Sequence, residues 1–386
     1  MKVILGSDSL QQPLTGIGRY ALEIARGLLA APRIEALLGY DLGRVHSLEE
    51  KLARLDAPPG EAPAQGSALR RRAAQSPLVT TLYQHYVKLL SARLLRGYGD
   101  YLFHSPNFHL PRHPGPSVVT VHDLSYRLFP EYHPAARVRW MNSMVPESLQ
   151  AADRIICVSA ATRADVLREY GVSAEKTVVI PLGVDPDFRP RAAQEVEAVL
   201  ARHGLDYGSY FLCVATLEPR KNIEGLLDAY LALPSALRQR FPLMLGGGVG
   251  WHSEALLARL AAEEGSGQVR RLGYLPEAEL MALYSGAMCF VYPSHYEGFG
   301  LPVLEAQASG IPVITSDVSS LPEVACEASL LLQPGDVDAL REALQRAAED
   351  ASWRAECVAS GLARAAGFTW QQCVDQTIEL YHHVHR

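Results

Sequence analysis

Residues 294–305 read Ser-His-Tyr-Glu-Gly-Phe-Gly-Leu-Pro-Val-Leu-Glu, and the apolar run 290–292 that precedes them is typical of a buried strand. Gly298 and Gly300 allow a turn with close backbone approach, and Pro302 suits the first turn of a helix. The first amides of such a helix lack intrahelical partners and carry the positive end of the helix dipole. The stretch therefore predicts a strand, a turn and a helix N-terminus that can hold an anionic group.

Two glutamates lie on either side of this predicted junction. Glu297 falls in the turn and Glu305 in an early turn of the helix. Because an ionised carboxylate only accepts hydrogen bonds, both residues suit the hydroxyl groups of a sugar or a ribose. A half-buried, capped helix with a dipole-favoured Glu305 would explain the same pattern, so other segments must decide between the two interpretations.

The composition is that of an ordinary globular protein. The chain has 386 residues, of which 48% are hydrophobic and 20% are charged, and its length fits two domains. A net charge of -6 argues against a general nucleic-acid-binding protein, which would be broadly basic. Six scattered cysteines without a C-x-x-C pair indicate buried free thiols. The first apolar run is too short for a signal peptide and no stretch has the length of a membrane span, so we expect a cytoplasmic protein.

Short apolar runs alternate with longer amphipathic segments along the whole chain. This alternation predicts parallel sheets covered on both faces by helices, in two doubly wound α/β units. The proline-rich segment 180–190 separates two series of runs, and we place a domain boundary there, with domains at 1–185 and 186–370. The predicted strands are 3–5, 101–103, 117–121 and 154–158 in the first series, and 210–214, 242–245, 288–292 and 311–315 in the second.

Two consecutive segments depart from this alternation. Residues 57–76 are rich in Ala, Pro, Gly and Arg, and we expect them to form a mobile connection. Residues 78–96 are apolar at helical spacing and follow Arg70, Arg71 and Arg72. Such a basic amphipathic helix is compatible with peripheral contact to an anionic membrane surface, and a core helix with one solvated face fits the same pattern.

Two cations follow the first strand of the second series. Arg220 and Lys221 lie at the carboxyl end of a predicted parallel strand, where sheets of this kind bind their ligands. An arginine can form two hydrogen bonds to phosphate oxygens while a lysine supplies a compact charge, so the pair could neutralise a diphosphate. A surface ion pair between Arg220 and Glu218 is the alternative interpretation.

Two further turns follow strands of the first series. Gly16 and Gly18 open an amphipathic helix, but the third glycine of the dinucleotide-binding fingerprint is missing, and an ordinary strand-to-helix turn would also explain them. His122 ends the strand at 117–121. A histidine there could donate a hydrogen bond to a sugar hydroxyl, although a lone histidine can equally be structural.

Acidic pairs that could bind a metal ion have simpler explanations. The acid-x-acid patterns at 185–187 and 336–338 could hold Mg²⁺ beside a diphosphate. The first pattern lies at the proposed domain boundary, and Asp336 of the second is typical of a helix N-cap. We therefore expect no metal and no other cofactor. Ser320 and Glu323 match a capping box, which leaves Glu323 without a catalytic role.

With its paired glutamates, the Glu218-Pro-Arg-Lys221 segment, the Gly16-Ile-Gly18 turn and His122-Asp123, the chain resembles a retaining glycosyltransferase of family 4 over nearly its full length. The resemblance implies the GT-B architecture, in which two Rossmann-like domains face each other across a cleft that holds a nucleotide-sugar donor. The C-terminal domain would hold the nucleotide and the N-terminal domain the acceptor. By the same resemblance, residues 371–386 would form a helix that crosses back to the N-terminal domain.

The resemblance also implies roles for individual residues. Arg220 and Lys221 would bind the donor diphosphate and stabilise the charge of the leaving group. Glu297 would contact the donor sugar and His122 would face it across the cleft, which completes the expected catalytic set. The other expected donor-binding residues are Glu305 at the ribose, Gly16 and Gly18 near the diphosphate, Tyr274 and Leu275 near the base, and the turn Gly298, Phe299, Gly300 and Leu301, whose amides would complete the sugar and phosphate contacts. Ala215 stands where several relatives have an arginine or a glycine.

These motifs are most similar to those of bacterial mannosyl- and rhamnosyltransferases of surface-polysaccharide assembly. We therefore expect transfer of mannose from GDP-mannose, with retention and without a metal, onto a lipid-linked or polysaccharide acceptor, as in O-antigen and lipopolysaccharide biosynthesis. Two alternatives are a nucleotide-sugar epimerase of the same architecture and a non-catalytic nucleotide-sugar-binding module. An epimerase would make a new sugar nucleotide without any acceptor, and the module would bind donor without acceptor-dependent nucleotide release.

Overall fold

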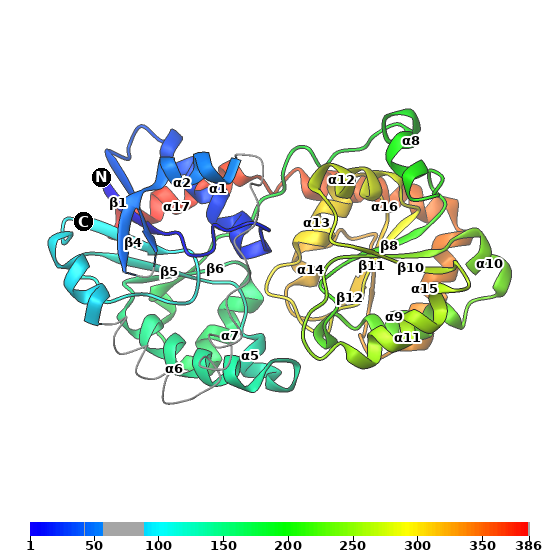
Figure 1. Cartoon of the computed structure of the whole chain (residues 1–386), viewed down its shortest axis with the longest axis horizontal. Helices are drawn as coiled ribbons and strands as arrows, with labels where there is room; N and C mark the ends of the chain where they lie inside the picture. The colour runs from blue at the N-terminus through cyan, green and yellow to red at the C-terminus, as the bar shows by residue number, and fades with distance from the viewer. Residues whose placement is uncertain (42, 57–88, 385–386) are drawn as a thin grey trace.

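The computed structural model describes residues 1–41, 43–56 and 89–384, which fold into two lobes of similar size (Figure 1). The predicted connection at 57–76 and the three arginines at 70–72 lie outside the described residues, and so does the first part of the helix predicted at 78–96. The end of that helix is described, because residues 89–94 are helical.

The N-terminal lobe is built on a seven-stranded sheet in the order β3-β2-β1-β4-β5-β6-β7. All neighbouring pairs are parallel except β2 and β3, which are antiparallel at the edge of the sheet. The four strands predicted in this half are confirmed as β1, β4, β5 and β6. The strands are β1 Lys2–Gly6, β2 Ala36–Asp41, β3 Arg44–Ser47, β4 Tyr101–Ser105, β5 Ser117–Val121, β6 Arg154–Cys157 and β7 Thr177–Val179.

The C-terminal lobe holds a six-stranded, fully parallel sheet in the order β10-β9-β8-β11-β12-β13. The predicted strands are confirmed as β8, β9, β11 and β12, while the two edge strands were not predicted. Edge strands pair on one side only, so they can be short and carry exposed charge, as β10 does, and their sequences lack a long apolar run. The strands are β8 Phe211–Val214, β9 Leu243–Gly246, β10 Val269–Gly273, β11 Cys289–Tyr292, β12 Val313–Ser316 and β13 Leu330–Leu332.

Helices cover both faces of each sheet, which confirms the predicted α/β fold with two doubly wound units (Figure 1). The helices of the N-terminal lobe are α1 Gly16–Ala30, α2 Leu48–Asp56, α5 Ser125–Leu128, α6 Ala135–Ala151 and α7 Ala160–Tyr170, with the 3-10 turns η1 Leu95–Gly97, η2 Pro130–Tyr132 and η3 Ala174–Lys176. Those that follow are α8 Ala193–Arg202, η4 Pro219–Lys221, α9 Ile223–Leu231, α10 Ser235–Arg240, α11 Glu254–Glu264, α12 Glu277–Gly286, α13 Leu301–Ala308, α14 Leu321–Val324, α15 Val337–Glu349, α16 Ala351–Ala365 and α17 Trp370–Val384.

The last helix, α17, lies in the N-terminal lobe, against α1 (Figure 1). Gly27 of α1 faces Val374 of α17 so closely that a Cβ atom at Gly27 would come within 2.5 Å of both γ-carbons of Val374. Deeper in the lobe, the Tyr381 hydroxyl bonds Nδ1 of the buried His104 on β4. Helix α17, which follows the C-terminal lobe in the chain, therefore packs into the N-terminal lobe and connects the two.

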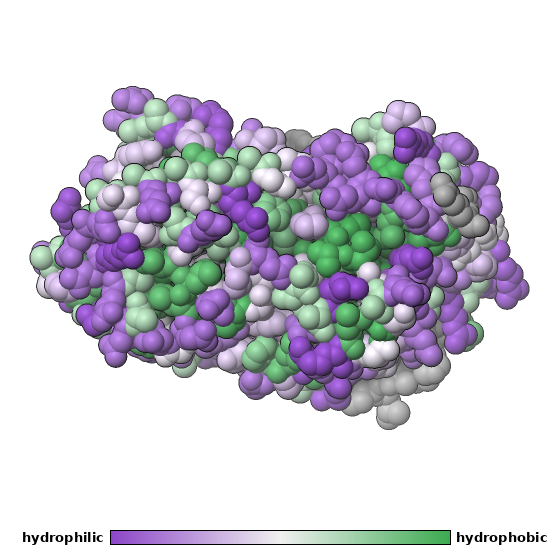
Figure 2. Space-filling view, turned by 180° about the vertical axis from the view of Figure 1, so that it is seen from behind, coloured by the Kyte–Doolittle hydropathy of each residue, from purple (hydrophilic) through white to green (hydrophobic). Residues whose placement is uncertain are grey.

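Hydrophilic and apolar residues are separated between the surface and the interior, as expected for an ordinary globular composition. Hydrophilic residues cover most of the back of the molecule, and apolar residues gather there in separate areas (Figure 2). All six cysteines are buried free thiols, as predicted. Within the described ranges, no helix combines the length and the apolar character that crossing a membrane requires.

The contact between α1 and α17 yields the first prediction. Gly27→Ala places a methyl group against the branched Val374 side chain, which has little freedom to turn away inside a helix. We expect the variant to lose about 1–3 kcal/mol of unfolding free energy, although alanine is the better helix former. Gly265→Ala, at a position where a Cβ atom meets nothing within 4 Å, is the control. Urea unfolding monitored by circular dichroism measures both variants, and equal midpoints for the two would contradict the packing argument.

Candidate functional site

The candidate site lies where β8 and β11 end side by side in the C-terminal sheet. The chain turns through η4 after β8 and through residues 293–300 after β11, so these two connections share one edge of the sheet. They are bonded to each other: the His295 amide donates to the Arg220 carbonyl at 2.9 Å, and the Asn222 side chain donates to the Pro293 carbonyl at 3.1 Å. Asn222 has a φ of +54°, a left-handed conformation that asparagine tolerates better than most residues. The cations and the acidic loop are thus brought together by backbone geometry.

The Glu297 carboxylate lies between the two predicted cations. Arg220 Nη1 donates to Glu297 Oε2 at 2.9 Å, and Lys221 Nζ donates to Glu297 Oε1 at 2.6 Å. Arg220 Nη1 also donates to the Tyr296 carbonyl at 2.7 Å, and Lys221 Nζ donates to the Tyr292 hydroxyl at 2.7 Å. Glu297 and Lys221 are each only 8% exposed, so this is a buried charge cluster and not a surface ion pair. Arg220, Lys221 and Glu297, predicted separately from two motifs, form one unit, here called the Glu297 triad.

Within the triad, opposite charges offset the effect that burial has on each group's pKa. Burial alone would raise the pKa of Glu297, but Arg220 and Lys221 outweigh it and lower this pKa to about 2. Burial opposes the charge of Arg220 as well, yet Glu297, Asp123 and Glu218 raise its pKa above the ordinary value. The pKa of Lys221 is lowered by burial and by Arg220, while Glu297 and Glu218 act in the opposite direction. The carboxylate is therefore ionised at neutral pH because two cations hold it.

The alternative interpretation of Arg220 is half right. Arg220 does bond Glu218, with Nη2 to Oε1 at 2.8 Å and Nε to the same oxygen at 3.2 Å. Glu218 is only 4% exposed, however, so the pair is not the solvated surface contact that the sequence suggested. Two carboxylates share the arginine, and Arg220 is oriented toward the loop by both.

The turn before α13 has the predicted conformation, but one glycine has an unforeseen reason. Gly300 adopts a φ of +113°, which strongly favours glycine. Gly298 is required by the facing lobe, because a Cβ atom there would lie 1.6 Å from the carbonyl oxygen of His122. Among the described residues, the amides of Phe299, Gly300 and Leu301 donate to no protein acceptor. These amides are available to donate to an anion, and anion binding at this helix start stays a prediction.

Glu305 lies in the first turns of α13, half-buried, with its Oε2 accepting from the Tyr284 hydroxyl at 3.0 Å. Burial raises the pKa of Glu305 to about 7, and the Tyr284 hydrogen bond and the charge of Arg19 act against this increase. Arg19 comes from α1 of the other lobe and pairs with Asp185 and with Glu277. Arg19 could not be selected from the sequence, since an arginine in the first turn of a helix belongs to no ligand-binding motif.

His122 and Asp123 follow strand β5, and the structure places their side chains in different surroundings. His122 is buried, and its Nε2 donates to the Pro106 carbonyl at 2.8 Å. Burial lowers the pKa of His122, which favours the neutral ring. Its neighbour Asp123 is the residue near the triad: burial would raise its pKa, but Arg220 lowers it below the ordinary value. Asp123, to which the sequence assigned no role of its own, thus belongs to the electrostatic environment of Arg220.

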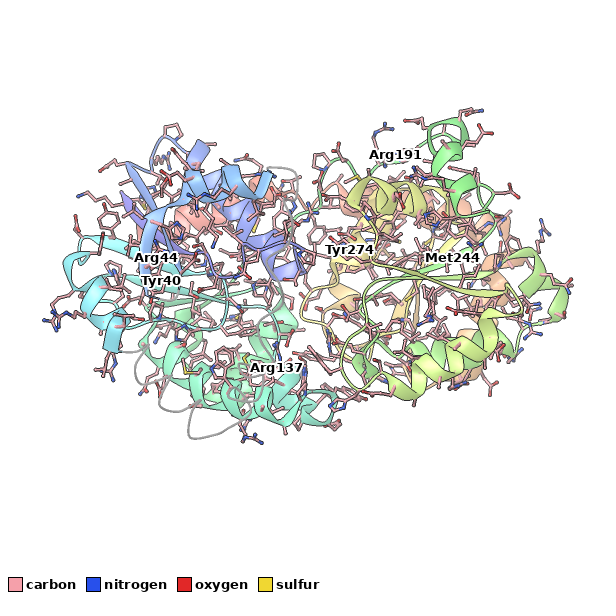
Figure 3. The ribbon with its side chains drawn as sticks, in the orientation of Figure 1. Tyr40, Arg44, Arg137, Arg191, Met244 and Tyr274 are labelled. Atoms are coloured by element: carbon pink, nitrogen blue, oxygen red, sulfur yellow. The ribbon has the colours of Figure 1, made fainter. Side chains whose placement is uncertain are left out.

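The remaining predicted positions belong to the first turn of α1 and to the segment that follows β10. Gly16 and Gly18 belong to the first turn of α1, where the Thr15 hydroxyl caps the Gly18 amide at 3.2 Å. A Cβ atom at Gly18 would lie 2.8 Å from the Ser9 carbonyl, whereas Gly16 faces open space. Tyr274 is 64% exposed and lies on the side of its lobe that faces the other one (Figure 3). Leu275 packs in the core beneath Gly246, so its side chain is not available to a ligand.

The N-cap predicted at Asp336 is confirmed, and the metal-free site stays a prediction. Asp336 caps α15 through the Ala339 amide at 2.9 Å, and in the described part of the chain no three His, Cys, Asp or Glu side chains form a metal-binding group. The predicted capping box at Ser320 is wrong. The Ser320 hydroxyl donates to the Glu297 carbonyl at 2.9 Å, and Glu323 accepts the first amides of α7 in the other lobe. Sequence spacing could not reveal these partners because they are far away in the chain.

Two family models match the chain, one in each lobe. The model described as "Glycosyltransferase Family 4" matches residues 14–188, and the model described as "Glycosyl transferases group 1" matches residues 202–363. Among curated proteins, the chain is 40% identical over 382 residues to O-antigen chain mannosyltransferase B of Escherichia coli, covering 99% of both chains. It is also 32% identical over 273 residues to the serotype-specific mannosyltransferase WbdA of Escherichia coli, but it spans only 33% of that longer protein.

Solved structures give the fold independently. The structure of Anabaena HepE in complex with UDP and glucose superposes with a TM-score of 0.72 over 99% of both chains, at 19% sequence identity. At this identity the likeness concerns the fold alone, and it confirms the predicted GT-B architecture. In this fold two Rossmann-like units face each other, as the two sheets of this chain do (Figure 1).

The low pKa of Glu297 yields the second prediction. Glu297→Gln removes the carboxylate that pairs with Lys221 and one of the two that pair with Arg220, and we expect it to cost about 3–5 kcal/mol at pH 7. Because the pKa of Glu297 is lowered to about 2, its contribution is complete above its ordinary value of 4.5 and is lost as the pH falls toward 2. The difference between variant and wild type should therefore shrink between pH 7 and pH 3.

Urea unfolding at both pH values measures this difference, and Glu356→Gln, an exposed position on α16, serves as the control. A stability gap of the same size at both pH values would mean that the carboxylate is not held by the two cations.

Proposed function

This chain belongs to glycosyltransferase family 4, and we propose that it transfers mannose from GDP-mannose to a lipid-linked or polysaccharide acceptor with retention of the anomeric configuration. Mannose as the transferred sugar is supported by the name of the O-antigen chain mannosyltransferase to which the chain is 40% identical over 382 residues. The observation that carries the assignment of the site is the Glu297 triad, because it places one carboxylate and two cations at the carboxyl edge of the C-terminal sheet.

We infer that the triad changes partners when the donor binds. In the structure, Arg220 and Lys221 both pair with Glu297, and Arg220 pairs with Glu218 as well. A diphosphate beside them would compete for the same cations, and Glu297 would become free to accept hydrogen bonds from the sugar hydroxyls. The unpartnered amides at the start of α13 supply further donors for phosphate oxygens. The exchange keeps the buried charges compensated in both states.

Charge placement then accounts for the chemistry. As the bond from the anomeric carbon to the diphosphate breaks, negative charge grows on the leaving group and positive charge on the sugar. Arg220 and Lys221 stabilise the leaving group, and the ionised Glu297 stabilises the sugar. In retention by same-face attack, the departing phosphate oxygen accepts the proton of the acceptor hydroxyl, so no protein nucleophile is needed. His122 would lie across from the sugar, with Asp123 nearer to Arg220.

The ends of the donor are assigned to residues around the triad. Glu305 would accept the ribose hydroxyls, and the exposed ring of Tyr274 would lie against the base. Gly16 and Gly18 would let the start of α1 approach the diphosphate. Two protein cations would replace a divalent metal in neutralising the diphosphate. Work on a lipid-linked acceptor would place the enzyme at the cytoplasmic face of the membrane.

Transfer assays test the function directly. We expect purified protein to move mannose from GDP-mannose to a mannose-terminated, lipid-linked acceptor in the presence of EDTA, giving an α-linked product by NMR. UDP-glucose, UDP-galactose and dTDP-rhamnose serve as competing donors. Transfer only from another donor, transfer that requires a divalent metal, or a new sugar nucleotide formed without acceptor would each overturn the corresponding part of the proposal.

Lys221→Ala tests the assigned diphosphate site. Removing one preorganised cation should lower kcat/KM by about 100-fold and weaken GDP binding, because the lysine acts on both ground-state and leaving-group charge. The matched control is Lys176→Ala, a lysine in the other lobe whose Nζ donates to the Gln150 carbonyl at 2.7 Å. Full turnover by Lys221→Ala with its fold intact would refute the site.

The pKa of Glu305 predicts a pH dependence of donor binding. With a pKa of about 7, the ionised fraction of Glu305 rises about tenfold between pH 6 and pH 8, and only the ionised form offers all its acceptor sites to the ribose. GDP affinity should therefore increase with pH over this range in the wild type. Calorimetry measures GDP binding to Glu305→Gln and to the control Glu356→Gln over this pH range. Because both variants bind the same nucleotide, the titration of the nucleotide itself cancels in the comparison. An unchanged pH profile in Glu305→Gln would contradict the ribose assignment.

A further inference from the structure

One face of α7 in the N-terminal lobe contacts the loop that carries Glu297. Ser159, the N-cap, and Thr162 and Asp165 lie three residues apart, so their side chains share one face of the helix. All three are at least 92% buried. Each of them has a hydrogen-bond partner in the C-terminal lobe, more than 130 residues further along the chain.

Two hydroxyl groups of this face bond one carbonyl of the loop. Ser159 Oγ donates to the Gly298 carbonyl at 2.7 Å, and Thr162 Oγ1 donates to the same oxygen at 3.0 Å. The Gly298 backbone also lies so close to the His122 carbonyl that no side chain could be accommodated there. The residue immediately after Glu297 is thus held by the other lobe at its carbonyl and at its α-carbon.

Tyr296, the residue immediately before Glu297, is held in the same way. Its hydroxyl donates to Asp165 Oδ2 at 2.7 Å and accepts from the Leu124 amide at 3.3 Å. Its carbonyl accepts from Arg220 Nη1 at 2.7 Å, so the side chain of Tyr296 is bound by one lobe and its backbone by the triad of the other. A displacement of α7 would therefore move an atom that bonds Arg220.

A third contact fixes the start of α7 itself. The Glu323 carboxylate of the C-terminal lobe accepts the Ala160 amide at 2.8 Å and the Ala161 amide at 2.6 Å, which are two of the unpaired donors at a helix N-terminus. A carboxylate at this end is also favoured by the helix dipole. The position of α7 relative to the loop is consequently set from both sides.

We propose that the face Ser159–Thr162–Asp165 of α7 is a positioning element for residues 293–300, the loop that carries Glu297. This face places Glu297 for the sugar only when the two lobes are in contact through Tyr296 and Gly298. This face of α7 thereby contributes to catalysis without touching the donor. The inference rests on the proposed function for its kinetic consequence, but the structural coupling between the lobes can be tested without any donor.

The distance between the lobes provides the donor-independent test. Spin labels at Arg139→Cys on α6 and Ala258→Cys on α11 occupy exposed positions in different lobes, while the native cysteines are buried. We expect Tyr296→Phe and Thr162→Val to shift the distance distribution of the ligand-free protein toward longer values. Thr162→Ser keeps the hydroxyl, and Tyr170→Phe removes an α7 hydroxyl that bonds Tyr126 within the same lobe, so both should match the wild type. Wild-type distances in Tyr296→Phe and Thr162→Val would overturn the proposal.

Steady-state kinetics on the same variants give the catalytic test. Tyr296→Phe should lower kcat by about tenfold or more while the donor KM changes little, because positioning of the sugar-binding carboxylate is lost and the nucleotide contacts are kept. Thr162→Ser should restore the kcat that Thr162→Val loses. A wild-type kcat in Tyr296→Phe, or an equal loss in Tyr170→Phe, would contradict the positioning role. Absence of transfer by the wild type from any donor would refute the proposed function, and the distance measurement would still decide the coupling.

Discussion

The pairing of one buried carboxylate with two buried cations is the constraint on which the site depends. Glu297 could not remain ionised at its depth without Arg220 and Lys221, and neither cation could be buried there without an anion. The cluster requires β8 and β11 to be neighbours, because each contributes one side of it. The same geometry creates a place where an entering diphosphate finds two cations already desolvated and oriented.

The backbone of Glu297 is fixed as firmly as its side chain. Its amide donates to the Ser319 hydroxyl at 3.0 Å, and its carbonyl accepts from the Ser320 hydroxyl at 2.9 Å. The flanking residues are bound to α7 of the other lobe through Tyr296 and Gly298. The C-terminal lobe thus supplies the charges, and the contact between the lobes determines where the loop holds them. A helix that returns from the C-terminal lobe to α1 limits how far the lobes can separate.

The sequence was sufficient for the elements whose signals are local. The alternation of apolar runs predicted eight strands, all confirmed, and the turn at 294–305 was predicted with its helix start. Arg220, Lys221 and Glu297 were selected because each lies at the carboxyl end of a predicted parallel strand. Roles assigned to them by family resemblance stay predictions until a ligand is bound. Edge strands such as β10 were missed because their residues are charged and exposed on one side.

The contacts between the lobes could not be predicted from spacing. Glu323 matches a capping box three residues after Ser320, yet both side chains bond groups far away in the chain. Gly298 has the sequence context of a ligand-binding glycine, and only the position of His122 reveals the second reason for it. Asp165 belongs to no motif, and the motif that contains Asp123 does not show that its partner is Arg220. The role of each of these residues depends on a partner that only the fold brings near. Local sequence spacing does not identify such a partner.

The exchange of partners within the Glu297 triad is the central claim, and a crystal structure of the protein with its preferred nucleoside diphosphate, chosen by thermal shift among GDP, UDP and ADP, tests it most directly. The account predicts phosphate oxygens within hydrogen-bond distance of Arg220 and Lys221, with the Glu297 carboxylate released from at least one of the two cations toward the space for the sugar. A nucleotide whose phosphates lie elsewhere, with both contacts of Glu297 unchanged, would contradict it.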